Sequence, residues 1–571
     1  MTTTSEKAGA LAEPTVPKPV SATVDYLDQR VGAASMIKGL ARKIFPDHWS
    51  FLLGEIALYS FIVLLLSGTF LTMFFVPSMA EVHYPEDALP VTMRGVEMSE
   101  AFASTLNMSF HVRGGLLMRQ IHHWAALMFV GAMVVHMLRI FFTGAFRKPR
   151  ELNWVIGFTM LILSLVAGLT GYSLPDDVLS GNGLRITDGV IRSIPIIGAY
   201  MSYMVFGGEF PGTDVIPRMF TLHILLIPGI ILALVAVHLF LVFWQKHTQY
   251  PGPGRTDKNV VGYPLMPVYM AKAGGFFFMV FGVIALMGAT MSINPVWNYG
   301  PFDPALVSAG AQPDWYMLFL EGSLRLMPGQ PEFVLFDRWT LSLNVLIPAV
   351  VVPGLLFTFL GAYPFIEGAV TKDSGEHHVL DRPRNVATRT ALGTSMLTVF
   401  FVLLVAGSND LLATHFGLSL NAITWVLRFA IFLLPVAVFQ VTKRICLALQ
   451  RKDREVVLHG VESGTVRRTA DGRFYEVHEP LDDYERWVKV GHHVYRPLEL
   501  EPLEDSNGVR RPGGKLDGVR TKLSHFFYED RVEPVTPAEL AAAHSNGEHD
   551  ELPVGGGVHA GELTSVGGTS R

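Results

Sequence analysis

The chain has 571 residues, of which 50% are hydrophobic and only 17% charged, with a net charge of −5. This composition excludes an ordinary soluble enzyme, because apolar runs long enough to cross a ~30 Å hydrocarbon core recur along the sequence. The single cysteine excludes an internal disulfide, a CxxCH haem attachment and a Cys-ligated iron–sulfur cluster. We therefore expect a membrane protein whose cofactors are held by other side chains.

Residues 1–48 form a polar, partly basic leader ahead of the first apolar run. That run begins near residue 50, too late for the apolar core of a cleavable signal peptide. We predict that it is retained as a membrane span and that residues 1–30 are unstructured.

Eight apolar runs follow, and each must be helical because lipid offers no partner for backbone N–H and C=O groups. The predicted fold class is an all-α membrane protein with eight transmembrane helices. The runs are 51–75, 122–142, 154–171, 220–243, 274–293, 342–363, 391–407 and 424–446.

Lys and Arg concentrate in alternate interhelical loops, whereas the other loops are rich in carboxylates. Cytoplasmic loops carry the excess of Lys and Arg. The protein is therefore predicted to span the cell membrane with both termini on the cytoplasmic side. The cations are Arg139, Arg147, Lys148 and Arg150 after the second run, Lys246, Arg255, Lys258 and Lys272 after the fourth, and Lys372, Arg382, Arg384 and Arg389 after the sixth.

We predict four parts in the chain. A cytoplasmic leader spans 1–48, a four-helix bundle spans 49–250, a second four-helix membrane domain spans 251–446, and a partly disordered cytoplasmic extension spans 447–571. The extension contains short β-like pieces such as GRFYEVHE and ends in a tail rich in Gly, Ser and Thr. Cys446 is expected to pack as a small apolar residue.

Two of the apolar runs carry histidines at a long, regular interval. His122 and His136 are fourteen residues apart in the second run, and His223 and His238 are fifteen apart in the fourth. At about 100° per residue each pair lies on one helix face, with its members about 21 to 23 Å apart along the axis. The two helices run in parallel, so His122 faces His223 at an outer level and His136 faces His238 at an inner level. Such pairs suit the irons of two six-coordinate haems.

Glycines repeat the same interval in the other two helices of the bundle. Gly54 and Gly68 in the first run, and Gly157 and Gly171 in the third, are each fourteen residues apart. A glycine lets a flat group approach a helix backbone. We therefore predict two non-covalent haem b groups held by histidine pairs. Two other interpretations stay open: intramembrane histidines also serve as proton relays, and spaced glycines also mediate helix–helix contacts.

Three more polar side chains lie beside these histidines. Arg119 precedes His122 by one turn and Arg139 follows His136 by three residues. Each can pair with a haem propionate at its own surface, although cytoplasmic charge bias explains Arg139 almost equally well. His123 does not fit the interval and is expected to point elsewhere and form a hydrogen bond.

Four motifs resemble the cytochrome b subunit of the cytochrome bc1 complex, the quinol–cytochrome c reductase. They are RQIHH in the second run, GYSLPDDVLSGNGLRI after the third, RMFTLH at the start of the fourth, and QPDWY between the fifth and sixth. The opening HWSFLLGEIALY and the extension past residue 447 resemble the actinobacterial type, which respires with menaquinone.

The resemblance implies a division of labour between the two membrane faces. Menaquinol is oxidised near the outer face, and one electron passes to a separate Rieske iron–sulfur protein. The second electron crosses the membrane through the two b haems to a quinone near the inner face. Protons are released outside and taken up inside, which contributes to the proton gradient.

The resemblance also implies that PDWY forms the outer quinol site. Asp314 is the implied proton acceptor, and Tyr316 orients the carboxylate or the quinol ring. Pro313, Trp315 and Gly183 complete the implied quinol-binding set. Taken alone, PDWY is also typical of an interfacial Trp/Tyr anchor.

Two further parts of the sequence depart from the family pattern. LPDD stands where the family has LPWG, so Asp176 and Asp177 are new charges that serve either proton exit or a solvated loop. At the inner quinone site, Phe243 and Ala273 replace the usual His and Asp. His247 or Asp257 is a substitute contact, and normal haem reoxidation by quinone in a His247→Ala variant would remove that hypothesis.

The expected partners follow from the same resemblance: a Rieske subunit, a cytochrome c subunit, a second copy of the complex and a terminal oxidase. Membrane lipid surrounds the chain, and no nucleic-acid partner is expected. Two other classes remain as alternatives, a dihaem membrane anchor of another quinone-linked dehydrogenase and a proton-coupled transporter. Two reducible b haems per chain would argue against the transporter.

Overall fold

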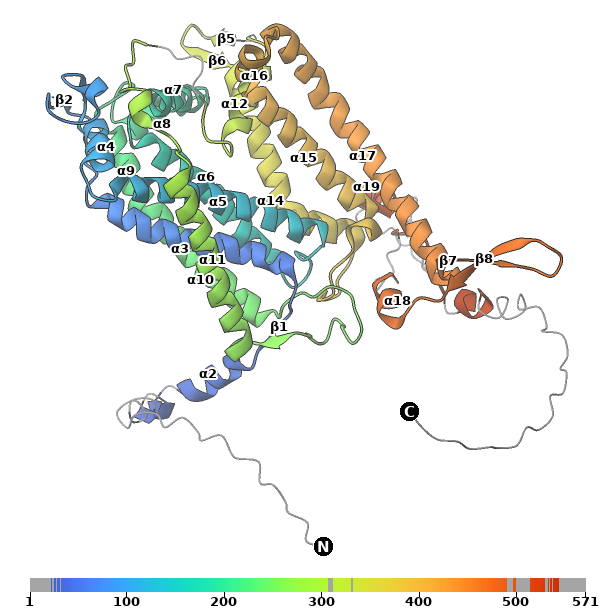
Figure 1. The fold of residues 1–571 in the computed structure, drawn as a ribbon. Coiled ribbons are helices and arrows are strands. Elements are labelled where there is room, and N and C mark those ends of the chain that lie inside the picture. The colour runs from blue at the N-terminus through green and yellow to red at the C-terminus, as the bar shows by residue number, and fades with distance from the viewer. Residues whose placement is uncertain are drawn as a thin grey trace, which may run out of the picture. The chain divides into compact units, whose positions relative to one another are not determined.

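A computed structural model describes residues 32–306, 312–329, 332–489, 497–499 and 514–528, with a few further residues within 22–30 and 532–543. The described part is mainly helical, and eight of its helices are long and apolar enough to cross a membrane (Figure 1). These spans are Trp49–Thr72, Gly115–Phe142, Glu151–Ser173, Val215–Trp244, Leu265–Thr290, Leu343–Thr371, Ala387–Gly407 and Leu420–His459.

Four spans consist of one main helix each, and the other four begin with a shorter turn or helix. The elements are η1 Trp49–Phe51 and α3 Leu52–Thr72; α5 Gly115–Phe142; α6 Glu151–Ser173; α9 Val215–Thr221, η3 Leu222–Leu226 and α10 Ile227–Trp244; η4 Leu265–Tyr269 and α11 Met270–Thr290; α13 Leu343–Leu346, η6 Ile347–Val351 and α14 Val352–Thr371; α15 Ala387–Gly407; and α17 Leu420–His459.

The predicted eight-helix fold is confirmed, but several helix bounds differ by seven or more residues. The fifth span begins at Leu265 rather than 274, and the sixth ends at Thr371 rather than 363. Helix α5 begins at Gly115 rather than 122, directly after Gly114, which has a positive φ of 77°. Helix α17 continues to His459 rather than 446. The extension of α17, LALQRKDREVVLH, is a largely polar segment of good helix formers that stays helical and carries little hydropathy signal, whereas the extension of α5, GLLMRQI, is largely apolar.

Two wide π-helical turns precede prolines inside the spans. The turn η3 ends two residues before Pro228, and η6 ends two residues before Pro353. Proline lacks an N–H and its ring clashes with the carbonyl four residues earlier, so a wider turn relieves the clash. The consequence for the bundle is local, because η3 carries His223.

The first four spans form the predicted bundle. Helix α3 packs on α5, α5 on α6, and α6 on α10, while α11 packs against both α3 and α5 (Figure 1). An apolar cluster fills the middle of the bundle, with Phe61 stacked on Phe129 at 5.3 Å between ring centroids. This cluster separates the level of His122 and His223 from the level of His136 and His238.

Short elements connect the spans. The helices are α2 Ala33–Ala41, α4 Glu100–Phe110, α7 Val178–Arg192, α8 Gly198–Phe206, α12 Leu318–Leu326 and α16 Asn409–Phe416, with 3-10 turns η2 Val91–Met93, η5 Val296–Asn298 and η7 Pro383–Asn385. The strands form antiparallel pairs, β1 Ile44–Phe45 with β4 Tyr263–Pro264, β2 Glu81–His83 with β3 Glu97–Ser99, and β5 Glu332–Leu335 with β6 Trp339–Ser342.

The chain divides into two compact units. The first comprises 1–250, 254–381 and 392–439, and the second comprises 251–253, 382–391 and 440–571. Within the second unit, β7 Val461–Arg468 and β8 Phe474–Glu479 form a hairpin where the sequence has its β-like pieces, and two helices follow, α18 Asp483–Lys489 and α19 Gly514–Tyr528.

Contacts inside the second unit tie its 382–391 segment to its 440–571 segment. Arg382 and Arg384 both pair with Asp453, at 3.1 and 3.2 Å. Cys446 is buried, as expected for a small apolar residue. The prediction that residues 1–30 are unstructured is wrong where the structure describes them, because residues 22, 25–26 and 28–30 are helical. The rest of 1–30 and the tail after residue 543 lie outside the described residues, and the four-part division of the chain stays a prediction.

Candidate functional site

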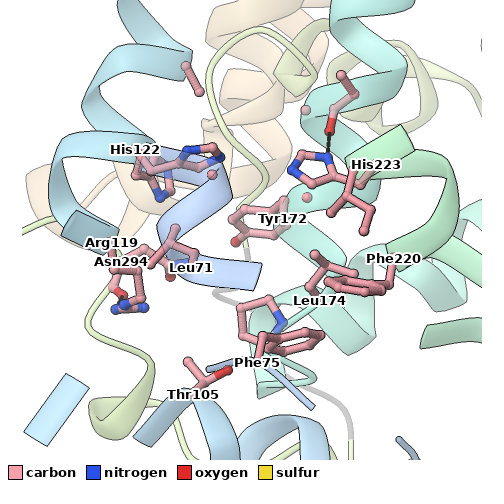
Figure 2. Close-up of a pocket in the computed structure, with 18 of the residues that line it drawn as sticks. Leu71, Phe75, Thr105, Arg119, His122, Tyr172, Leu174, Phe220, His223 and Asn294 are labelled. Atoms are coloured by element: carbon pink, nitrogen blue, oxygen red, sulfur yellow. Dashed lines mark hydrogen bonds between the residues drawn. The ribbon is translucent and has the colours of Figure 1, made fainter. Parts of the chain in front are cut away.

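The outer histidine pair faces a shared cavity inside the bundle. His122 from α5 and His223 from η3 lie on opposite sides of it, with ring centroids 6.2 Å apart (Figure 2). Glycines stand directly behind both rings. A Cβ added to Gly68 would lie 3.2 Å from Cε1 of His122, and one added to Gly171 would lie 2.4 Å from Cε1 of His223. The imidazoles therefore occupy space that only glycine leaves open.

The inner pair repeats this arrangement below the apolar cluster. His136, His238, Gly54 and Gly157 line one cavity with about 590 Å³ of empty space. A Cβ added to Gly54 would lie 3.1 Å from Cε1 of His136, and one added to Gly157 would lie 3.6 Å from Cε1 of His238. Each of the four glycines thus meets one of the four histidines, at two levels.

Hydrogen bonds at the outer level leave the same nitrogen of both rings available. The hydroxyl of Ser67 donates to the carbonyl of Val63 at 2.7 Å, so its oxygen accepts from Nδ1 of His122 at 2.9 Å. Nδ1 of His223 donates to the carbonyl of Ala167 at 3.0 Å (the dashed line in Figure 2). Each ring is therefore protonated at Nδ1, and Nε2 keeps the lone pair that a metal ion requires.

These residues fit an iron held inside a macrocycle. Imidazole–metal bonds are about 2 Å long and each ring adds ~1 Å to its centroid, so one ion between two rings places the centroids about 6 Å apart. The outer separation of 6.2 Å agrees with this value. In the described residues no group of three or more His, Cys, Asp or Glu side chains is placed to hold a metal. The other ligands must then come from a cofactor, as they do in haem.

Of the two predicted arginines, Arg119 lines the outer cavity, whereas Arg139 follows His136 by three residues and is not part of the inner cavity's lining. Arg119 donates to the carbonyl of Asn294 at 2.6 Å, while its buried Nε has no partner among the described residues (Figure 2). Arg139 lies over the rings of Phe51 and Tyr250, and its buried Nε and Nη2 also lack partners there. Both guanidinium groups retain donors for an anionic group.

Asp314 lies between the side chains of His123 on α5 and Tyr316 in its own loop. Its Oδ1 is 3.1 Å from Nε2 of His123, and its Oδ2 accepts from the hydroxyl of Tyr316 at 2.9 Å. The Tyr316 hydroxyl fits because α6 has Gly168 there, where a Cβ would lie 2.4 Å away. His123 is expected to form a hydrogen bond away from the paired histidines, and this contact agrees with that expectation. Its partner was not foreseeable, because Asp314 lies 191 positions later in the chain.

A second cavity, here called the PDWY cavity, opens on the other side of Asp314. It contains about 1010 Å³ of empty space, and its wall includes four of the five predicted quinol-site residues, namely Gly183, Pro313, Asp314 and Tyr316. A Cβ at Gly183 would meet nothing within 4 Å, so a side chain there would project into open space. Trp315 packs against Gly131 and does not belong to the lining of the described cavities.

The two acidic residues of LPDD each accept a structural hydrogen bond, and their role in proton exit stays a prediction. Both are buried, so the expectation of a solvated loop is wrong. Asp177 caps helix α7 by accepting from the backbone N–H of Leu179 at 3.1 Å. Asp176 accepts from the hydroxyl of Ser99 at 2.6 Å. Burial raises the pKa of Asp176 to about 7, against the hydrogen bond from Ser99 and with help from the Asp177 charge.

At the inner face, the two substitute contacts differ. Asp257 accepts from the backbone N–H groups of His378 and Val379, at 2.7 and 2.8 Å, and so acts as a tether between loops. Nε2 of His247 is buried without a partner among the described residues. Burial beside Arg150 and other cations lowers the pKa of His247 to about 4, which keeps the ring neutral. His247 stays a prediction for the inner quinone contact.

Comparisons with known proteins agree with the motifs. Residues 127–301 match the family described as cytochrome b(N-terminal)/b6/petB. The chain is 55% identical over 529 residues to the cytochrome bc1 complex cytochrome b subunit of Streptomyces coelicolor, covering 91% of this chain and 96% of that one. It is 50% identical over 494 residues to the subunit of the same description from Mycobacterium tuberculosis, covering 86% and 88%.

A solved structure supports the fold. A chain of a hyperthermophilic respiratory Complex III matches with a TM-score of 0.56 at 21% identity, covering 74% of this chain and 99% of that one. Together with the eight apolar helices, these comparisons define the class: a multi-pass membrane cytochrome of the b type, whose cofactor is haem b.

Within that class, the chain belongs to the family of cytochrome b subunits of the cytochrome bc1 complex, the quinol–cytochrome c reductase. It therefore works with the other subunits of that complex. The resemblance predicted from RQIHH and PDWY is confirmed, and the two alternatives, a dehydrogenase anchor and a transporter, are wrong.

Proposed function

We propose that the chain holds its haems at two levels, the outer one between His122 and His223 and the inner one between His136 and His238. The observation that carries this proposal is the contact of one glycine with each histidine, repeated at both levels. When bound, the two haems supply one-electron carriers between the outer and inner faces. The chain holds the iron with neutral imidazoles and excludes water with apolar helices.

The arginines complete the two sites. Arg119 and Arg139 each present a buried guanidinium nitrogen without a partner among the described residues. A propionate is the anionic group of haem b, and a carboxylate accepts strong, charge-assisted hydrogen bonds from a guanidinium. We assign Arg119 to the outer haem and Arg139 to the inner one.

The PDWY cavity is the proposed site of menaquinol oxidation. Asp314 accepts a proton from a quinol hydroxyl, and the hydrogen bonds from His123 and Tyr316 hold its carboxylate between this cavity and the outer histidine cavity. One electron leaves for a Rieske partner and the other crosses the bundle toward a quinone near the inner face. The 50–55% identity to actinobacterial subunits supports menaquinol as the substrate.

In the proposed orientation, both termini lie on the cytoplasmic side of the cell membrane. The charge bias of alternate loops supports it, since cytoplasmic loops are those rich in Lys and Arg. The proposed partners are a Rieske subunit, a cytochrome c subunit, a second copy of the complex and a terminal oxidase. Subunits that copurify with the chain test this set, and a preparation lacking an iron–sulfur protein would contradict it.

Single alanine variants of the four histidines test the haem assignment. His122→Ala and His223→Ala should each remove the outer spectral component, while His136→Ala and His238→Ala should each remove the inner one. The measurement is a redox-resolved difference spectrum of the purified complex. His123→Ala, which removes a membrane histidine that belongs to neither pair, should retain both spectral components. Loss of one and the same component in all four variants would refute the pairing.

A further inference from the structure

A second carboxylate lines the PDWY cavity. Glu321 stands on α12, seven residues after Asp314, and both belong to the cavity wall. The Glu321 side chain is only 10% exposed, and its Oε2 is buried without a hydrogen-bond partner among the described residues. An unpartnered buried carboxylate oxygen is costly unless something else uses it.

The two carboxylates of the cavity differ in what they already bind. Both oxygens of Asp314 are engaged, one near His123 and one by Tyr316. Glu321 uses only Oε1, which accepts from the guanidinium of Arg325. Oε2 of Glu321 is therefore the carboxylate oxygen in this cavity that stands ready to receive a hydroxyl.

A charged network holds Glu321 from behind and extends toward the outside. Nη1 of Arg325 pairs with Asp410 at 2.7 Å, and Asp410 also accepts from Gln312 at 2.8 Å. Asp410 is 22% exposed, so the network runs from the buried cavity to the solvated end of α16. The guanidinium stays charged at all physiological pH values and favours the ionised form of both carboxylates.

Opposing effects on Glu321 suit a group that takes and releases a proton. Burial raises the pKa of its carboxyl, whereas the charge and hydrogen bonds of Arg325 oppose that shift. The charged and titratable groups that face it are Arg325 on α12, Asp410 on α16, Tyr172 on α6, and Asp314 and Tyr316 in the preceding loop.

We propose that Glu321 is a catalytic base of the outer quinol site, which accepts a quinol hydroxyl proton at Oε2. This inference rests on the proposed function of the PDWY cavity. The quinol O–H bond breaks and a carboxyl O–H bond forms, while the two electrons leave by the routes of the reductase reaction. Arg325 is a positioning residue, and Asp410 holds its guanidinium from the partly exposed side.

The experiment measures menaquinol oxidation by the purified complex across a range of pH, in four variants. Glu321→Gln keeps the size of the side chain but removes the base, and should slow oxidation roughly tenfold to a hundredfold and flatten the pH profile. Glu321→Asp should restore a pH-dependent rate. The carboxyl stretching band that appears in infrared difference spectra on quinol oxidation should be weaker in Glu321→Gln.

The matched control is Asp188→Asn on α7. Asp188 is also a buried carboxylate paired with an arginine four residues later, Arg192, but it does not line the cavity. This variant should keep the wild-type rate. Haem spectra and subunit content report assembly in every variant.

The outcomes separate the inference from the proposed function. If Asp314→Asn is slow but Glu321→Gln keeps the wild-type rate, pH profile and infrared band, the role of Glu321 is overturned and the quinol site stands. If Asp314→Asn and Glu321→Gln both behave as wild type, the PDWY cavity itself is not the quinol site. An equal loss in Asp188→Asn also overturns the inference, because any buried carboxylate would then have the same effect.

Discussion

The outer and inner levels of the bundle share one backbone plan but differ in their surroundings. Both are built from a histidine pair with one glycine behind each ring. At the outer level, Ser67 and the carbonyl of Ala167 fix the rings through Nδ1, whereas Nδ1 of His136 is buried without a partner among the described residues. The outer cavity also adjoins a carboxylate, Asp314, and the inner face gathers cations around a neutral His247.

This difference teaches that one helical repeat can set the position of two cofactors while their neighbours set the chemistry. The heights of the two sites follow from helix geometry and are therefore shared. The donors, acceptors and charges around each site come from other parts of the chain and differ. Those neighbours tune ligand basicity and proton traffic separately at each face.

The largest effect is expected from the glycines, whose spacing to the rings is unequal. Gly171→Ala should strongly reduce outer haem content, because the added Cβ would lie 2.4 Å from His223 and overpacking costs about 1–3 kcal/mol. Gly157→Ala is the matched inner change and should be mild, since its Cβ would lie at an ordinary 3.6 Å from His238. Haem content per chain measures both, and equal losses would contradict the inequality.

A smaller effect is expected from the outer hydroxyl. Ser67→Ala should weaken outer haem binding about 10–100-fold, because the ring of His122 loses the acceptor that fixes its protonated nitrogen. The inner component should be unchanged. Haem retention during dilution or competition measures this, and Ser60→Ala, another buried serine on α3, is the control. Equal weakening at both levels would show that the hydroxyl acts on the helix rather than on the outer ring.

The last effect concerns the stability of the fold and its pH dependence near the outer face, rather than haem binding. The pKa of Asp176 is raised to about 7 in the folded protein. Its contribution to the free energy of unfolding is therefore fully present below about pH 4 and is lost as the pH rises through 7. Asp176→Asn should therefore make the complex more thermostable at pH 8, by about 1–4 kcal/mol, and leave it nearly unchanged at pH 4. Thermal unfolding at both pH values measures this.

The control for that change is Asp87→Asn. Asp87 is an exposed carboxylate in the loop between the first and second spans, which is predicted to lie on the same outer side as Asp176. This variant should shift the unfolding temperature little at either pH. A stabilisation by Asp176→Asn that is as large at pH 4 as at pH 8 would mean that titration is not its cause.

Several features of the fold and the site could be predicted from the sequence because they are local or periodic. Apolar length sets the eight spans, and the fourteen-residue interval puts His122 and His136 on one helix face. Helix ends were less predictable, as the polar extension of α17 to His459 shows. Hydropathy reports lipid contact, and a helix that continues into water leaves no such signal.

Periodicity and composition therefore determine the membrane class of this chain, the two levels of histidines and the glycines that match them. Tertiary structure alone decides that His123 meets Asp314, that Ser67 holds His122, and that Glu321 presents an open oxygen to the PDWY cavity. The physical reason is that one-dimensional patterns encode which face of a helix a residue occupies. Which side chain lies opposite depends on how distant helices and loops pack, and that packing has no period in the sequence.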